Sequence, residues 1–77
     1  MDRKIERVLM LYTKLTEGRL IKKQELAWLF DVNIRTIQRD IDDIRCYYSN
    51  HPEQGVEIIY DRKLGGYQLR KFKGLEE

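Results

Sequence analysis

Apolar side chains recur every three or four residues in three stretches of the chain, and this spacing is typical of amphipathic helices. We expect helices over about residues 2–16, 23–30 and 34–48. Asp2 can cap the first helix, and Gly18 is a natural stop after it. The positions expected to face the core are, helix by helix, Ile5, Val8, Leu9, Tyr12 and Leu15; Leu26, Ala27, Leu29 and Phe30; and Ile34, Ile37, Ile41, Ile44 and Tyr48.

After residue 55 the period changes to two, because apolar and other residues alternate over Val56–Asp61. Residues 62–66 are interpreted as a turn, since Gly65 and Gly66 can both adopt positive φ without steric cost. We therefore expect a β-hairpin over about residues 56–72, with its apolar face over the helices. Residues 19–21 are too short for a helix and are expected to be an extended link or a short strand.

Three residues, 31–33, separate the second and third expected helices. Asn33 is a good N-cap, because its side-chain oxygen can accept from the exposed amides of the next turn. At 100° per residue, Arg35 and Arg39 project opposite the isoleucine stripe of the third helix. Two helices joined by a tight turn, the second with outward polar residues, are typical of a helix-turn-helix, and a hairpin directly after them makes the unit winged.

The expected fold is therefore mainly α with a small β-hairpin, a three-helix bundle plus a wing, in one domain over residues 1–77. Side chains near the start of the third helix of such a unit can enter a DNA major groove, where Arg pairs with guanine and Gln with adenine. The partner expected is double-stranded DNA. A helix N-terminus also carries partial positive charge and free amides, which favour a nearby phosphate. The expected base contacts are Arg35, Thr36, Gln38 and Arg39, and the expected phosphate contacts are Asn33, Arg62 and Lys63.

Composition and charge change this picture little. The 77 residues carry a net charge of +2, and residues 56–73, which include the expected wing, hold five basic and two acidic side chains. The single cysteine, Cys46, has no partner for a disulfide or a zinc site, which favours a cytoplasmic location. There is no apolar run of about 20 residues, so no membrane partner is expected. No cluster of catalytic-type residues is evident, so neither enzymatic activity nor a metal or cofactor is expected. Asp40 is expected to be a structural partner for a neighbouring basic side chain or a backbone amide, because its carboxylate would repel phosphate if it faced DNA.

Residues 26–41, with Arg35-Thr36-Ile37-Gln38-Arg39-Asp40-Ile41 as their most specific part, resemble the helix-turn-helix of WYL-domain and DeoR-type bacterial transcriptional regulators. Residues 65–69 resemble the wing strand of the WYL branch and of the biotin-repressor N-terminal domain. The resemblance implies that Arg35, Thr36, Gln38 and Arg39 touch DNA. Where the family usually has Gly in the turn, this chain has Asp31, which tolerates left-handed backbone better than most residues.

Several alternatives stay open at this point. Trp28 falls on the helix face opposite Leu26 and Phe30, and a large exposed aromatic often marks an interface, so the chain is alternatively a winged-helix protein-interaction module. An RNA-binding winged helix is disfavoured, because no aromatic platform for unstacked bases is evident. Family members normally carry a ligand-sensing domain after the wing, so the chain is either an excised domain or a small regulator. Pairing is expected as a homodimer on DNA or through such a C-terminal effector domain.

Overall fold

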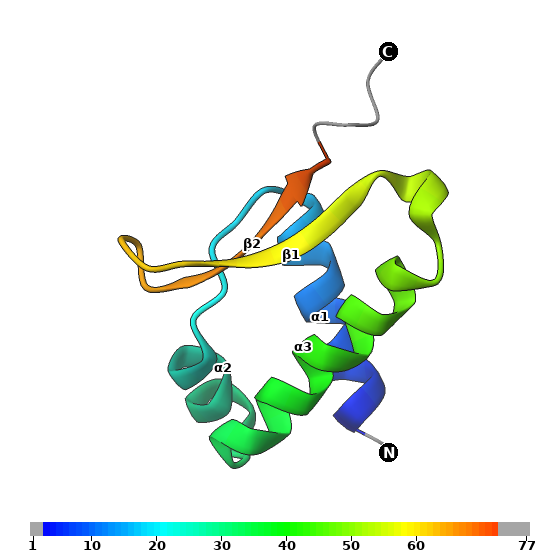
Figure 1. Cartoon of the computed structure of the whole chain (residues 1–77). Coiled ribbons are helices and arrows are strands. Elements are labelled where there is room, and N and C mark those ends of the chain that lie inside the picture. Colours follow the sequence, from blue (N-terminus) through cyan, green and yellow to red (C-terminus); the bar gives the residue numbers. More distant parts are fainter. Residues whose placement is uncertain (1–2, 73–77) are drawn as a thin grey trace.

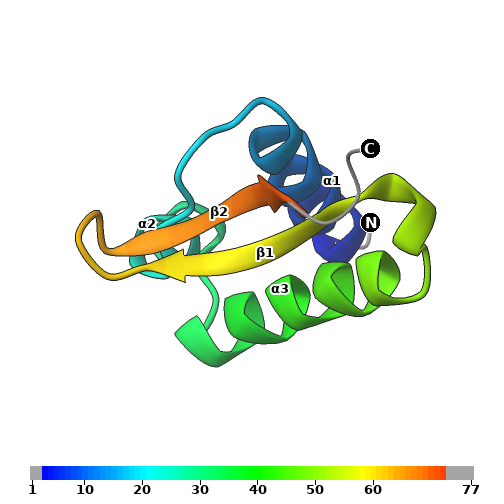
Figure 2. The ribbon, with the colours of Figure 1, turned by 45° about the horizontal axis from the view of Figure 1, so that its top comes forward.

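A computed structural model describes residues 3–72 of the chain. Its elements, in chain order, are α1 (Arg3–Thr16), α2 (Lys23–Phe30), α3 (Ile34–Ser49), a 3-10 turn (Pro52–Gln54), β1 (Val56–Asp61) and β2 (Gly66–Lys71). The two strands form an antiparallel hairpin that lies across α1 and α3 (Figures 1 and 2). The expected elements are all confirmed, α3 being one residue longer than predicted, while Asp2 as a cap lies outside the described residues.

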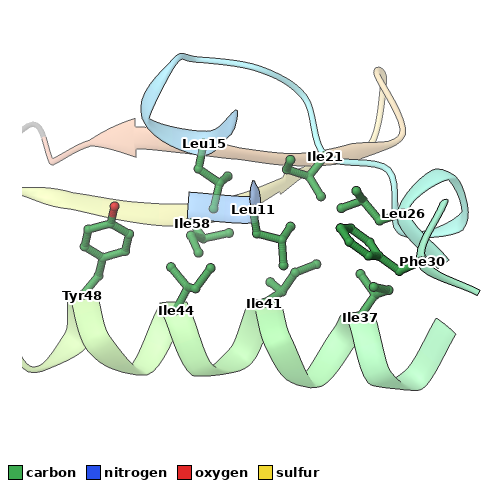
Figure 3. Packing of buried hydrophobic residues seen from close by; sticks show 10 residues of the cluster. All are labelled: Leu11, Leu15, Ile21, Leu26, Phe30, Ile37, Ile41, Ile44, Tyr48 and Ile58. Carbon is green, nitrogen blue, oxygen red and sulfur yellow. The ribbon is translucent and has the colours of Figure 1, made fainter. Parts of the chain in front are cut away.

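The core is a single cluster to which every helix and the hairpin contribute. Figure 3 shows a row of side chains on α3 pointing toward α1, α2 and β1. Ile37 and Ile41, at the centre of this row, have no exposed surface, which confirms the buried side of α3. Ile34 is an exception, since it remains partly exposed at the first position of the helix. The buried apolar residues are Leu11, Leu15, Ile21, Leu26, Phe30, Ile37, Ile41, Ile44, Tyr48 and Ile58.

The predicted buried face of α1 is wrong for three of its five residues. Ile5 and Leu9 are 61% and 59% exposed, and Tyr12 is also exposed, whereas Leu11 and Leu15 are buried. The apolar residues of α1 form two adjacent stripes, and the structure buries the one with leucines four residues apart. Periodicity alone does not choose between two such stripes, because both repeat at helical spacing.

On α2 the prediction is wrong for Leu29, which is 49% exposed, while Leu26 and Phe30 are buried as expected. A helix of eight residues has just over two turns, so it offers the core only a narrow stripe. Ala27 is partly buried beside that stripe and packs against the core. The outer face of α2 therefore presents apolar surface to solvent.

Arg7 occupies the α1 position one turn before Leu11 on the buried face. Its Nε donates to Oδ2 of Asp40 at 2.6 Å and its Nη2 to Oδ1 at 3.3 Å. Both side chains are buried, at 10% and 1% exposure. Such a two-pronged pair satisfies a charge that would otherwise be costly to remove from water. It joins α1 to α3 and confirms the structural role predicted for Asp40.

The turn between α2 and α3 follows from two residues. Asp31 adopts the left-handed conformation, with φ 55° and ψ 51°, as its short polar side chain allows. The Asn33 side-chain oxygen accepts from the backbone N–H of Arg35 at 2.8 Å, which caps α3 as predicted. The start of α3 is therefore fixed relative to α2.

The wing is fastened to the segment before α2. Ile21 forms an antiparallel bridge with Tyr67, with both N–H···O distances 2.8 Å, so the expected short strand is present as a single bridging residue. Gly65 has a φ of 72°, as predicted for the turn, but Gly66 does not have positive φ. Instead, a Cβ at Gly66 would lie 2.7 Å from the Ile21 carbonyl oxygen and from a Leu20 side-chain carbon. Gly66 is thus required by close approach of two backbones, not by turn geometry.

Two helices joined by a capped three-residue turn, a preceding helix that completes the bundle, and a hairpin after the second helix of the pair are all present. The fold is a winged helix-turn-helix.

Candidate nucleic-acid interface

The first turns of α3 present two arginines to solvent. Arg35 and Arg39 are four residues apart and exposed, on the side of the helix away from the buried Ile37 and Ile41. Among residues 3–72, no hydrogen bond or ion pair engages either guanidinium group. Thr36, next to them, is half-buried. Both guanidinium groups are therefore exposed and unengaged within the described residues, which confirms the outward projection predicted from the helical spacing.

Gln38 differs from its neighbours because both ends of its side-chain amide are engaged. Its Oε1 accepts from Nζ of Lys23 at 2.8 Å and from the hydroxyl of Tyr67 at 3.2 Å. Its Nε2 donates to Oδ1 of Asp42 at 3.1 Å. The side chain thus links α3 to α2 and to the wing, and it is half-buried where the arginines are exposed.

The basic tip of the wing lies on the same side of the molecule as α2 and the start of α3 (Figures 1 and 2). Arg62 and Lys63 are both exposed there. Asp61 holds the turn, because its carbonyl oxygen accepts from the Gly65 N–H at 2.8 Å and its Oδ1 from the Leu64 N–H at 3.0 Å. The acidic side chain beside the tip is therefore occupied by the turn itself.

A hollow of 380 Å³ lies between the wing, the start of α2 and the start of α3. Its lining includes Lys22 and Lys23 from α2 and its cap, Ile34 from α3, and Tyr60 and Tyr67 from the wing. The two lysines were missing from the predicted site. The signal for them was present, since two adjacent lysines stand at the start of an expected helix, but only the fold brings them opposite the wing.

Asn33 is exposed at the junction of α2 and α3. Its side-chain oxygen is used in the helix cap, so the amide NH₂ is the donor left for a phosphate. Acidic groups further along α3 are paired with bases: Asp43 with Lys4 at 3.2 Å and Asp42 with Arg45 at 3.3 Å. Among the described residues of α3, the arginines without an acidic partner are therefore the two in its N-terminal half, Arg35 and Arg39.

Trp28 lies on the outer face of α2 and is 83% exposed, beside the exposed Leu29. A second apolar surface lies on the outer side of α1 and the C-terminal half of α3, where Leu9, Tyr12 and Tyr47 line a hollow of 330 Å³. Exposed aliphatic and aromatic side chains that adjoin one another are a feature of interaction surfaces.

No group of three or more His, Cys, Asp or Glu side chains in residues 3–72 is placed to hold a metal ion. None of the described helices has the length and apolar character needed to span a bilayer.

The chain is 35% identical over 63 residues to a protein of Bacillus subtilis (strain 168) described as "Uncharacterized HTH-type transcriptional regulator YobV". The match covers 82% of this chain and 18% of YobV, so the chain spans about a fifth of the length of this relative. No protein-family model matches the chain, and no solved structure matches it significantly. The similarity agrees with the helix-turn-helix seen in the structure.

Proposed function

We propose that this domain binds double-stranded DNA in a sequence-specific way and is the DNA-reading part of a transcriptional regulator. The observation that carries the proposal is the pair Arg35 and Arg39, exposed and without side-chain partners in the described chain, at the start of a helix whose entry is fixed by the Asn33 cap. In a helix-turn-helix this helix lies in the major groove with its N-terminal residues against base edges. Arginine there makes two hydrogen bonds to guanine, to O6 and N7.

The proposed contacts are of two kinds, contacts to bases and contacts to phosphates. Arg35, Thr36 and Arg39 contact bases. Gln38 was predicted from the sequence to belong to the same set, but its side-chain amide is engaged in intramolecular hydrogen bonds. Asn33, Arg62 and Lys63 contact phosphates. We add the two lysines of the hollow, Lys22 and Lys23, to the phosphate contacts, because they flank the space between wing and α3 into which a DNA backbone would pass.

We further propose that the regulator is of the WYL or DeoR type and acts in the bacterial cytoplasm. Residues 26–41 and 65–69 carry this resemblance, and a Bacillus subtilis protein similar over 63 residues is described as a helix-turn-helix transcriptional regulator. That relative is more than five times as long as the aligned part. A function as the reading domain of a longer regulator, paired on DNA, fits both observations.

A second candidate function is protein interaction through the outer face of α2. The specific observation in its favour is Trp28, which is 83% exposed beside Leu29. The two functions make different demands on the surface. DNA binding needs Arg35 and Arg39 and tolerates Trp28→Ser, whereas a pure interaction module needs Trp28 and tolerates loss of both arginines.

Selection of bound duplexes from a random pool, followed by a salt titration of the selected duplex, tests the proposal. We expect a consensus, and log K should fall with log salt with a slope of about −0.9 for each phosphate neutralised. The double variant Arg35→Ala/Arg39→Ala should lose the consensus. Arg19→Ala is a control for the loss of one positive charge outside the proposed surface, because Arg19 is exposed on the link before α2 and pairs with Glu17. Recovery of a pool without a consensus, with Arg19→Ala as damaging as the double variant, would contradict the proposal.

A further inference from the structure

Gln38 lies between α3, which carries the proposed base contacts, and the wing, which carries proposed phosphate contacts. Reading adenine requires a glutamine to present its amide oxygen and its NH₂ together, one to N6 and one to N7. In this structure the oxygen accepts from Lys23 and Tyr67, and the nitrogen donates to Asp42. The oxygen could accept from adenine N6 only after a hydrogen bond to Lys23 or Tyr67 was broken, and the one to Lys23 involves a charged donor and is correspondingly strong.

Tyr67, the wing residue that contacts Gln38, is itself held on several sides. Its ring centroid lies 5.9 Å from Nζ of Lys23 and 5.8 Å from the guanidinium carbon of Arg45, within the range of cation–π attraction. Tyr60 packs against it edge to face at 5.0 Å. Its backbone is bridged to Ile21. The Tyr67 hydroxyl is therefore a fixed point on the wing, and Gln38 is its contact on α3.

Arg45 adds a second tie between the same elements. It donates to the carbonyl oxygen of Ile58 in β1 at 3.3 Å and pairs with Asp42, the residue that accepts from Gln38. Lys23, Gln38, Asp42, Arg45 and Tyr67 thus form one polar network, which we call the wing junction. It joins α2, α3 and both strands at the point where the wing leaves the helices.

We propose that Gln38 is a positioning residue, which sets the angle of the wing against the recognition helix α3 and does not read a base. The inference rests on the proposed function, because it assigns roles within that DNA-binding surface. The spacing between base contacts on α3 and phosphate contacts at the wing tip is fixed by the wing junction. Loss of Gln38 misplaces the wing tip, so it costs phosphate contacts and leaves base preference intact.

The test compares Gln38→Ala, Tyr67→Phe and the double variant on the selected duplex and on duplexes with every single base-pair change. Each single variant should weaken binding to all duplexes alike by about threefold to tenfold, the range that one or two ordinary hydrogen bonds represent. The double variant should be no weaker than the worse single variant. In a background of Arg62→Ala/Lys63→Ala, Gln38→Ala should have little further effect, because the wing contacts are already lost. Gln54→Ala is the control, since the Gln54 side chain donates to the Tyr47 hydroxyl and, within the described residues, has no hydrogen bond to the wing junction.

A charge-neutral swap, Gln38→Glu with Asp42→Asn, separates positioning from reading even if Gln38→Ala folds poorly. A glutamate at position 38 still accepts hydrogen bonds from Lys23 and Tyr67, and an asparagine at position 42 supplies the donor for the hydrogen bond between positions 38 and 42. Glutamate, however, has no NH₂ group to donate to adenine N7. We expect the swap to bind with the parent preference. Relaxed preference at a single base pair in either Gln38→Ala or the swap would overturn the proposal, as would additive losses in the Gln38/Tyr67 pair.

Thermal unfolding of the same variants without DNA keeps the two proposals apart. The shifts in unfolding midpoint caused by Gln38→Ala and Tyr67→Phe should be non-additive, because the two side chains share one hydrogen bond. If the parent protein showed no duplex preference while these shifts remained non-additive, the proposed function would be wrong, but the link between Gln38 and the wing would be supported. Additive shifts would show that the Gln38–Tyr67 hydrogen bond does not link α3 to the wing.

Discussion

Arginine side chains occur in two different environments in this small domain, one buried and paired with a carboxylate, the other exposed to solvent. Arg7 is buried and held by two hydrogen bonds to Asp40, whereas Arg35 and Arg39 are exposed and have no side-chain partner in the described chain. The sequence predicts the exposure of Arg35 and Arg39 well, because position on a helix after a capped turn is readable from spacing. It does not predict the pairing of Arg7, because the partner of Arg7 lies 33 residues away. Only the expectation that Asp40 has a structural partner pointed to it.

Arg35→Ala should cost about 1–3 kcal/mol of binding free energy on the preferred duplex and relax preference at one base pair, because a two-pronged contact to guanine is lost. Binding to duplexes with each single base-pair change measures both effects. An equal loss of binding free energy on the preferred and the scrambled duplexes would show that Arg35 contacts phosphate and does not read a base.

Asp40→Ala should lower the free energy of unfolding by about 3–5 kcal/mol, because it removes the carboxylate that accepts two hydrogen bonds from the buried Arg7 guanidinium. Replacing both residues, Arg7→Met with Asp40→Leu, should recover most of the loss, since the buried charges then disappear together. Denaturant unfolding measures both.

The pair Lys4 and Asp43 is the matched control, because it also joins α1 to α3 but is exposed. Asp43→Ala should change stability by about 1 kcal/mol or less. A loss for Asp40→Ala as small as that would mean that the buried pair contributes no more than a surface contact.

At the scale of elements, prediction succeeded where local chemistry decides and failed where packing decides. The turn of residues 31–33 was predictable, since an Asn cap and an Asp that tolerates left-handed backbone act through their immediate neighbours. The buried face of α1 was not, because Ile5 and Leu9 are as apolar as Leu11 and Leu15, and only the position of α3 selects between them. The engagement of the Gln38 amide oxygen was hidden for the same reason, since its donors come from α2 and β2.

The wing as an element should contribute affinity without specificity. Arg62→Ala/Lys63→Ala should weaken binding to all duplexes alike and flatten the slope of log K against log salt by about one to two units, because one phosphate contact is lost for each charge removed. Arg70→Ala/Lys71→Ala removes the same charge from the other end of the hairpin, where Arg70 pairs with Glu57, and should leave the slope near that of the parent. An unchanged slope in the tip variant would mean that the wing tip does not touch DNA.

At the scale of the whole molecule, one proposed recognition helix and two exposed apolar surfaces lead us to propose that the domain works in pairs. The described chain measures 43 × 30 × 19 Å, so one copy spans little more than one turn of DNA, about 34 Å. A net charge of +2 gives little non-specific attraction to compensate for so short a contact. The sequence has no long heptad run, and the longest helix within residues 3–72, α3, has 16 residues. The surfaces left for pairing are the outer face of α2 with Trp28 and the outer side of α1 with Leu9.

We therefore expect this chain to be a monomer in dilute solution and to pair when DNA holds two copies together. Sedimentation of the free chain at micromolar concentration should show a single monomeric species.

A duplex with two half-sites one helical turn apart should bind two copies cooperatively, because the two reading helices then enter the groove on the same side of the DNA. Five extra base pairs between the half-sites place the copies on opposite sides, so cooperativity should disappear while each half-site keeps its own affinity. Trp28→Ser should reduce cooperativity if the outer face of α2 makes the contact. A stable dimer of the free chain that Trp28→Ser leaves undisturbed would contradict this account and would place the dimer interface on another surface.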